Sequence, residues 1–201
     1  MQEWIKFSCK SLIKLMKRCF DFIVCILALV FFFPLLVIIG LYLKLNSSRP
    51  IFYWSDKIER NNKVFSMPKF RSIFINAPSF ATNLMKNLEQ WITPIGALLK
   101  KTSLDELPQL RSIVRGDLSL VGPRPEIYNQ HKLIELRTNA GTAALRSGLT
   151  GWVQVNGRDH LSIEKRALLD QQYLEAKSFK FDIHIIWLTF IKVLKANGAS
   201  N

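Results

Sequence analysis

The stretch "FIVCILALVFFFPLLVIIGLYL", residues 22–43, runs for 22 residues without a charged side chain. As an α-helix it would be about 33 Å long, since each residue adds about 1.5 Å, and the hydrocarbon core of a bilayer is about 30 Å thick. Pro34 stands near its middle, where the ring removes one helical hydrogen bond and bends or breaks the helix. The sequence therefore predicts a membrane helix with a kink at Pro34.

Basic residues flank this segment on both sides. They are Lys6, Lys10, Lys14, Lys17 and Arg18 before it, and Lys44, Arg49, Lys57, Arg60, Lys63, Lys69 and Arg71 after it. Because basic flanks stay on the cytoplasmic side of a membrane, both ends are expected there. From these residues alone two arrangements stay open: a kinked helix that spans the bilayer, and a re-entrant helix that enters and leaves through one leaflet. A buried core helix fits the length less well.

The composition of the chain points to an anionic partner. The formal net charge is +13, which favours phosphorylated ligands or lipid headgroups. A hydrophobic content of 49% favours membrane lipids over nucleic acid. The three cysteines lie at irregular spacing and show no disulfide pattern, and the three scattered histidines form no zinc pattern. We therefore expect a membrane protein that faces a reducing cytoplasm and binds no nucleic acid.

The fold class is expected to be α+β and predominantly helical. Two apolar runs around the polar turn "ERNNK" (59–63) predict a β-hairpin within residues 51–75, with Pro68 at an edge or a bulge. Thr93 and Ser162 are expected to cap two helices, and Asp182 to open the last one. That last helix has a wide apolar face, for which we favour the membrane interface over burial. The predicted helices cover residues 78–92, 93–101, 128–145, 162–178 and 181–198.

Two adjacent acids stand in "SLDEL" (103–107). Ser103 and Glu106 match the S-x-x-E capping box, in which each side chain bonds the other's backbone amide. Pro108 then forces the helix to kink or restart, so Asp105 and Glu106 lie beside free backbone N–H groups, where phosphates also bind. The pattern alone allows a helix cap or an active site.

Two further loops carry candidate functional residues. In "GPRP" (122–125) Arg124 stands between two prolines, and a stiff backbone that presents a guanidinium suits a phosphate clamp. The loop "SGLTGWVQVNGRDHLS" (147–162) has three glycines and polar residues that include Arg158. Each loop also fits an ordinary exposed turn when it is taken singly.

In combination, five motifs resemble the bacterial sugar transferase family of small monotopic polyprenyl-phosphate phosphoglycosyl transferases. The motifs are "KFRS" (69–72), "SLDELPQL" (103–110), "GDLSLVGPRP" (116–125), "GLTGWVQVNGR" (148–158) and the final apolar helix. The resemblance covers nearly the whole chain. It implies one sugar-transferase domain over residues 1–201, in which residues 1–45 form a re-entrant anchor broken at Pro34 and residues 46–201 a cytoplasmic catalytic part at the bacterial inner membrane.

The resemblance also implies a reaction. The family transfers a sugar 1-phosphate from a UDP-sugar to undecaprenyl phosphate, releases UMP and so begins the assembly of a surface glycan. It implies that Asp105 is the nucleophile, that Glu106 assists it, and that both carboxylates hold Mg²⁺. It further implies that Lys100, Arg124 and Arg158 bind substrate phosphates. The flanking sequences are similar to those of members that act on acetamido sugars, and a homodimer is compatible with this interpretation.

The chain departs from the family pattern at several positions. Lys100 stands where arginine is usual, and it keeps the charge without the bidentate fork. Ser147 replaces a common proline. In the hairpin turn Lys57, Glu59 and Asn62 replace a common arginine and two glycines. Lys100 is the best support for an alternative hypothesis, a non-catalytic membrane scaffold that recruits glycan-assembly enzymes.

Overall fold

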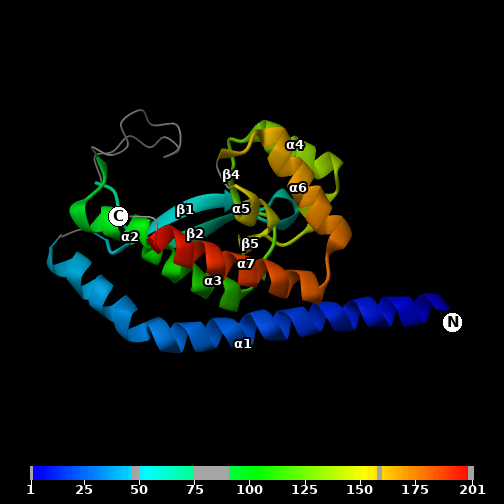
Figure 1. The fold of residues 1–201 in the computed structure, drawn as a ribbon, viewed down its shortest axis with the longest axis horizontal. Coiled ribbons are helices and arrows are strands. Elements are labelled where there is room, and N and C mark those ends of the chain that lie inside the picture. The colour runs from blue at the N-terminus through cyan, green and yellow to red at the C-terminus, as the bar shows by residue number, and fades with distance from the viewer. Residues whose placement is uncertain (1, 47–49, 75–90, 158–159, 199–201) are drawn as a thin grey trace.

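The computed structural model describes residues 2–46, 50–74, 91–157 and 160–198, which are mostly helical with two small sheets (Figure 1). The helices are α1 (Gln2–Leu45), α2 (Pro94–Lys101), α3 (Leu110–Arg115), α4 (His131–Asn139), α5 (Trp152–Asn156), α6 (Ile163–Ala176) and α7 (Phe179–Gly198). The strands are β1 (Phe52–Ile58), β2 (Val64–Phe70), β3 (Ser119–Val121), β4 (Glu126–Ile127) and β5 (Gly148–Thr150). Three short 3₁₀ helices are η1 (Arg60–Asn62), η4 (Leu104–Gln109) and η5 (Thr142–Ala144).

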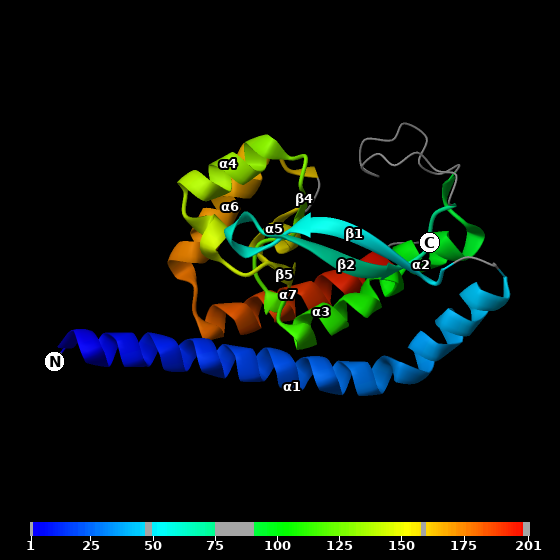
Figure 2. The same ribbon diagram turned by 180° about the vertical axis from the view of Figure 1, so that it is seen from behind.

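Helix α1 lies along one side of the molecule and bends in its C-terminal part, as Figures 1 and 2 show. Its portion Leu15–Leu45 is long and apolar enough to cross a membrane, and only 11% of its most hydrophobic window is buried. Pro34 lies inside the helix. The chain therefore stays helical through Pro34 and bends, where the sequence also allowed a break.

The bend lets α1 follow two separate cores. Cys25 packs in a cluster with Met67 of β2 and Ile113 of α3. Past the proline, Ile39 packs instead with Phe70 and with Leu99 of α2. A straight helix would leave one of these clusters uncovered, so burial of apolar area on both sides favours the bent form.

Lys17 of α1 forms hydrogen bonds with three other elements. Its ammonium donates to the Asp182 carboxylate of α7 at 2.5 Å, to the Val121 carbonyl of β3 at 3.0 Å, and to the Tyr173 hydroxyl of α6 at 3.2 Å. The Tyr173 hydroxyl in turn donates to Asp182 at 2.7 Å. The three donor bonds of a lysine ammonium are thus all used by protein groups.

Arg18 and Asp21 continue this polar seam along α1. Arg18 donates to the carbonyls of Val114 at 3.1 Å and Leu118 at 3.4 Å, close to the C-terminal end of α3. A cation at that end satisfies free carbonyls and complements the helix dipole. Asp21 accepts a bond of 2.6 Å from the Ser119 hydroxyl. Lys17, Arg18 and Asp21, named here the polar seam, fix α1 against the rest of the chain.

The predicted hairpin is confirmed. β1 and β2 pair antiparallel from Phe52 opposite Phe70 to Ile58 opposite Val64, and β4 pairs on the other side of β1. Pro68 therefore lies on an edge strand, where a missing N–H costs least. Asn61 and Asn62 have φ values of 58° and 59° in the turn, a conformation that asparagine tolerates almost as glycine does. A second sheet pairs β3 and β5 in parallel.

Two of the three predicted helix starts are confirmed. Thr93 accepts from the Gly96 amide and Ser162 from the Lys165 amide. The prediction that Asp182 opens the last helix is wrong, because α7 begins a turn earlier and the Ser178 hydroxyl accepts from the Phe181 amide.

The remaining helix predictions differ in extent. The helix predicted over residues 128–145 is shorter, since Gly141 adopts a φ of 72° after α4 and only a 3₁₀ turn follows. The helix predicted over residues 78–92 lies almost wholly outside the described residues.

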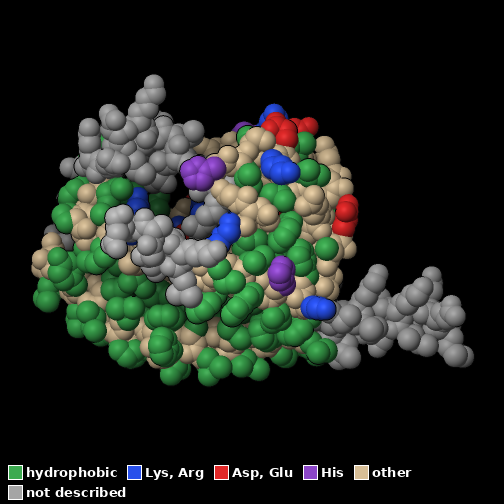
Figure 3. Space-filling view, viewed as in Figure 1, with side chains coloured by type: hydrophobic (Ala, Val, Ile, Leu, Met, Phe, Trp, Pro, Cys, Tyr) green, Lys and Arg blue, Asp and Glu red, His purple; other side chains and the backbone are tan. Residues whose placement is uncertain are grey.

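One side of the molecule is largely apolar. Figure 3 shows hydrophobic side chains gathered along α1 and α7, whereas most of the charged side chains visible in that view lie around α4 and α6. On α7 the exposed apolar residues are Phe179, Ile183, Trp187, Phe190 and Val193. Single exposed apolar residues are normal on a protein surface, but a continuous apolar face of this width indicates a surface that contacts another apolar surface.

Removal of the Lys17 ammonium tests whether the polar seam stabilises the protein. We expect Lys17→Met to lower the free energy of unfolding by about 3 kcal/mol, because a mostly buried carboxylate then loses its cation. The measurement is thermal unfolding in detergent, followed by tryptophan fluorescence. Lys132→Met is the matched control, since the Lys132–Glu164 pair is exposed to solvent. Equal stability of the two variants would contradict the role given to the seam.

Candidate functional site

The acidic pair lies on η4, directly after α2. Ser103 has a left-handed backbone (φ 57°, ψ 16°) that turns the chain sharply between the two helices. The predicted capping box is wrong: the Ser103 side chain makes no capping bond, and the Glu106 amide donates to the Ser103 carbonyl oxygen at 3.2 Å. The physical reason is the left-handed backbone of Ser103, because a residue that caps a helix with its side chain normally has β-region dihedral angles. Pro108 lies within η4, and the α-helix restarts at Leu110.

Asp105 and Glu106 have different environments. Asp105 is buried, with 7% of its surface exposed. Glu106 lies at the surface of the site and accepts a hydrogen bond of 2.8 Å from the Lys69 ammonium of β2. The two neighbouring carboxylates are therefore suited to different tasks, one as a desolvated reactant and one as a paired, partly solvated group.

Burial raises the pKa of Asp105 above its ordinary value, although the nearby ammonium groups of Lys69 and Lys100 lower it. The adjacent Glu106 carboxylate raises the same pKa further. Burial also lowers the pKa of Lys100, while Asp105 opposes that shift. Burial thus makes the ionised form of Asp105 unfavourable, and two nearby cations partly compensate for this effect. Carboxylates in functional sites commonly have such an environment.

A second group of cations faces this pair. Burial lowers the pKa of Lys57 to about 8, and the positive charges of Lys69 and Arg124 lower it further, against the opposing carboxylates of Glu126 and Glu106. Like charges repel one another unless an anion neutralises them. Lys57, Lys69, Lys100 and Arg124, named here the cation cluster, therefore form a site prepared for an anion such as a phosphate.

The loop that carries Arg124 is held by its backbone. The Gly122 amide donates to the Thr150 carbonyl at 2.9 Å, and the Pro123 carbonyl accepts from the Gly148 amide at 2.8 Å. A Cβ at Gly122 would lie 2.2 Å from the Arg146 carbonyl oxygen, so the close approach requires glycine. The fixed backbone holds Arg124 where its positive charge acts on Lys57.

A buried network of four charges supports this loop from behind. Arg137 of α4 donates to the Arg124 carbonyl at 3.0 Å and to Asp170 of α6 at 2.8 Å. Arg166 of α6 donates to Glu126, two residues after Arg124. All four residues are at most 8% exposed, and their charges sum to zero. The loop position is thus set by paired ions that belong to two helices.

The structure places Lys100 beside Asp105 and Arg124 close enough to Lys57 for their charges to repel. The roles given to Asp105, Glu106, Lys100 and Arg124 stay predictions. Arg158 lies outside the described residues. Sequence reasoning missed Lys57 and Lys69 as parts of the site. Lys69 stood in the quoted "KFRS" motif, but a strand lysine carries no sign of its partner; only the fold around β2 and η4 places it on Glu106.

The acidic pair is compatible with a magnesium ion. No group of three or more His, Cys, Asp or Glu side chains that could hold a metal occurs within the described parts of the chain. Mg²⁺, however, is usually held by one or two carboxylates together with waters and substrate phosphates. Asp105 and Glu106 offer that donor set, with oxygen ligands and a neighbouring cation cluster for the phosphates.

Comparisons with known proteins agree with one another. The profile of a family described as "Bacterial sugar transferase" matches residues 12–196. The chain is 34% identical to the exopolysaccharide production protein ExoY of Sinorhizobium fredii, over 91% of this chain and 87% of that protein. It is 35% identical to the uncharacterized sugar transferase EpsL of Bacillus subtilis, over 92% of this chain and 90% of that protein.

A larger relative shares the same region. The chain is 32% identical to the UDP-glucose:undecaprenyl-phosphate glucose-1-phosphate transferase of Escherichia coli, over 89% of this chain and 40% of that protein.

The pKa of Asp105 makes a prediction about stability. A carboxyl whose pKa is raised by folding binds a proton more tightly in the folded state, so its contribution to stability falls as the pH rises through the folded pKa. We expect Asp105→Asn to raise the unfolding temperature at pH 7 in magnesium-free buffer. The gain should vanish as the pH falls below the ordinary value of 3.8, because the carboxyl is then protonated in both the folded and the unfolded state. A gain that grew toward acid pH would contradict the desolvated carboxylate.

The buried network makes a second prediction. Arg137→Met leaves the Asp170 charge buried without its main partner, and we expect it to lower the free energy of unfolding by about 3–5 kcal/mol. The double variant Arg137→Met with Asp170→Leu removes both charges and should recover a large part of that loss. Chemical unfolding in detergent measures both values. If the double variant were less stable than the single one, the pairing would not explain the loss.

Proposed function

The chain belongs to the bacterial sugar transferase family, and from this premise we propose that it transfers a sugar 1-phosphate from a UDP-sugar to undecaprenyl phosphate and releases UMP. Undecaprenyl phosphate appears in the name of the Escherichia coli relative as its acceptor. The protein is then a phosphoglycosyl transferase at the first membrane step of surface glycan assembly.

One observation carries the proposal: a buried carboxylate, Asp105, faces the cation cluster. A carboxylate that attacks a negatively charged diphosphate meets strong repulsion, which Lys69, Lys100 and the other cations would reduce. Desolvation removes the water that otherwise stabilises the carboxylate. Both effects favour attack on phosphorus over simple ion pairing.

The proposed chemistry has two balanced steps. In the first, an oxygen of Asp105 attacks the β-phosphorus; an O–P bond forms, the bond to the α-phosphate oxygen breaks, and UMP leaves with the electron pair. In the second, a phosphate oxygen of undecaprenyl phosphate attacks the same phosphorus and the Asp105 carboxylate is released. A covalent intermediate divides one difficult transfer into two and lets a soluble donor and a lipid acceptor use one site in turn.

The other residues have supporting roles in this proposal. Lys100, Arg124 and Arg158 bind the phosphates of the donor, together with Lys57 and Lys69 of the cation cluster. Asp105 and Glu106 would hold Mg²⁺, which when bound supplies positive charge to the phosphates. Lys69 keeps Glu106 in place through the 2.8 Å hydrogen bond.

The apolar side of the molecule supports attachment to the cytoplasmic membrane. We propose that α1 enters and leaves through the cytoplasmic leaflet, with the bend in its C-terminal part as the turning region and residues 46–201 in the cytoplasm as the catalytic part. Both flanks of the apolar segment are basic, which favours one side for both ends. The exposed apolar residues of α7 would lie in the interface beside it.

For the donor we propose a UDP-linked acetamido sugar, from the sequence similarity of the segments around the site. The name of the Escherichia coli relative instead gives UDP-glucose, and that of a Salmonella typhimurium relative gives galactose. A panel of donors that includes UDP-glucose, UDP-galactose and their acetamido counterparts therefore decides between sugars with and without an acetamido group.

The activity test uses the full chain in detergent or nanodiscs with undecaprenyl phosphate, Mg²⁺ and each donor of the panel. We expect UMP release with at least one donor, and incorporation of label from that sugar into lipid. Asp105→Asn should lower the rate by at least about 1000-fold, since it removes the nucleophile of a covalent mechanism. Acid-stable labelled protein, trapped without acceptor, should disappear in the same variant.

The outcomes also separate an enzyme from a scaffold. Under the scaffold hypothesis no donor releases UMP, and cells that carry Asp105→Asn keep their surface glycan. Loss of the glycan in Asp105→Asn cells with normal levels of the membrane-bound protein would instead favour the enzyme.

A further inference from the structure

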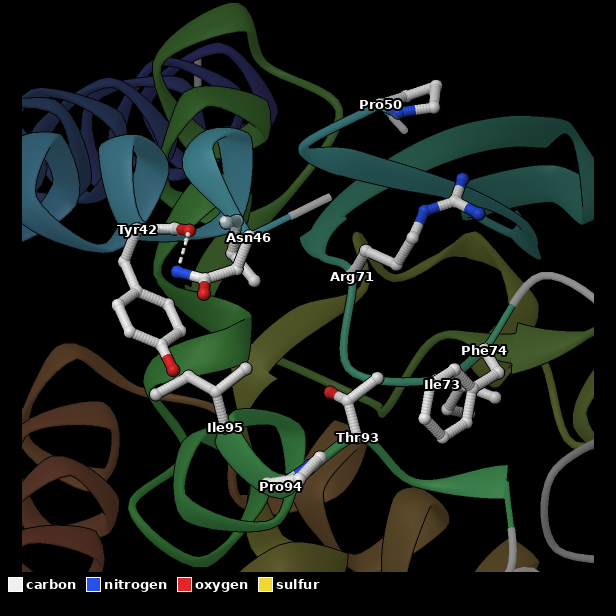
Figure 4. A pocket seen from close by; sticks show the side chains of 10 residues that line it. Tyr42, Asn46, Pro50, Arg71, Ile73, Phe74, Thr93, Pro94 and Ile95 are labelled. Carbon is white, nitrogen blue, oxygen red and sulfur yellow. Dashed lines mark hydrogen bonds between the residues drawn. The ribbon is translucent and has the colours of Figure 1, made fainter. Parts of the chain in front are cut away.

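A cavity of about 390 Å³ opens where α1 ends, next to the segments that follow β2 and precede α2. Figure 4 shows its wall: Tyr42 and Asn46 come from the end of α1, Arg71, Ile73 and Phe74 from the segment after β2, and Thr93, Pro94 and Ile95 from the start of α2, with Pro50 nearby. The cavity is distinct from the acidic pair, and the activity described so far assigns it no role. Its volume lies in the range of ligand sites.

The wall is apolar except for a few groups. The Asn46 amide donates to the Tyr42 carbonyl at 2.9 Å, and the Thr93 hydroxyl is used by Ser72 and Gly96. Arg71 differs: its Nε is shielded from solvent and has no hydrogen-bond partner among the described residues. A buried donor without an acceptor is costly, so a guanidinium in this state fits a site whose anionic ligand supplies the acceptor.

The position of the cavity links the membrane helix to the acidic pair. Tyr42 and Leu43 belong to the apolar portion Leu15–Leu45 that is long enough to cross a membrane, so a lipid could reach the cavity along α1. Arg71 follows Lys69, the partner of Glu106, by two residues. In Figure 4 its guanidinium extends away from Tyr42.

Helix α2 joins the same two places, with Ile95 at the cavity and Lys100 in its last turn beside Asp105. Ile95 and Lys100 are five residues apart in this helix, which is about 7.5 Å along its axis. This separation lies within the length of an extended isoprenyl chain of a few units.

We propose that this cavity holds the first isoprenyl units of the acceptor lipid, with the phosphate at Arg71 on its way to Asp105. The proposal rests on the proposed function, which requires an isoprenoid monophosphate. The apolar wall can contact the hydrocarbon chain, and the Arg71 guanidinium can bind the single phosphate. The cavity lies at the end of α1, where a ligand from the membrane would arrive. A donor sugar nucleotide, which is polar throughout, fits this wall poorly.

The test separates the two half-reactions. Exchange of labelled UMP into the UDP-sugar needs no acceptor and reports the donor step alone, whereas labelled lipid reports the complete transfer. Ile95→Trp fills the cavity, and we expect it to raise the KM for undecaprenyl phosphate at least 10-fold while exchange stays within 2-fold of the unaltered protein. Leu98→Trp is the matched control, because Leu98 lies on the same helix, is 54% exposed and does not line the cavity.

A second variant and three lipids identify the ligand chemistry. Arg71→Gln removes the cation and should raise the KM for the acceptor with exchange preserved, which also shows that the variant is folded. A photoreactive isoprenyl phosphate should label the cavity residues. Undecaprenyl phosphate should prevent that labelling, and neither undecaprenol nor phosphatidylglycerol vesicles should do so at equal concentration.

The outcomes are distinct. An unchanged acceptor KM in Ile95→Trp would overturn the proposal. Equal protection by phosphatidylglycerol would also overturn it, since the cavity would then be a general site for anionic lipids. Absence of UMP exchange in the unaltered protein would instead refute the proposed function, and loss of exchange in Ile95→Trp alone would place the cavity in the donor step.

Discussion

The structure depends on the Lys17 ammonium, which lies between the carboxylate of Asp182, the hydroxyl of Tyr173 and the carbonyl of Val121. A partly buried ammonium must be satisfied by protein or by water. Here protein satisfies it, and three elements from distant parts of the chain meet at one atom. The polar seam thereby fixes α1 against α3, α6, α7 and β3.

The site contains buried charged side chains, and their opposite charges offset the free-energy cost of burial only in part. Asp105 is buried near Glu106, and Lys57 lies near Lys69 and Arg124. The free-energy cost of burying these charges is offset by stabilising interactions elsewhere. The main ones are the neutral network of Glu126, Arg137, Arg166 and Asp170 and the two hydrophobic clusters that α1 covers. Groups with perturbed pKa values are common at functional sites, where they lower the stability of the protein. An anionic substrate would relieve the repulsion in the cation cluster.

Much of the fold could be predicted from patterns that act within a few residues. The hairpin follows from two apolar runs around a polar turn, and the caps at Thr93 and Ser162 follow from residue type and spacing. The same local rules failed at Ser103 and Asp182. Both residues match a helix-start pattern, but Ser103 turns the chain in a left-handed conformation, and Asp182 is paired with Lys17, 165 residues away. Local patterns cannot register a partner so distant in sequence.

The sequence by itself determined the apolar helix with Pro34, the alternation of the hairpin and the identity of the acidic pair, because each depends on neighbours along the chain. It also placed Lys100 close to Asp105, since five residues separate them. Only the tertiary structure decided that Lys69 bonds Glu106, that Lys57 and Arg124 face the same site, and that a cavity with Arg71 opens at the end of α1. Those groups come from different strands, loops and helices, and their distances are set by how the elements pack.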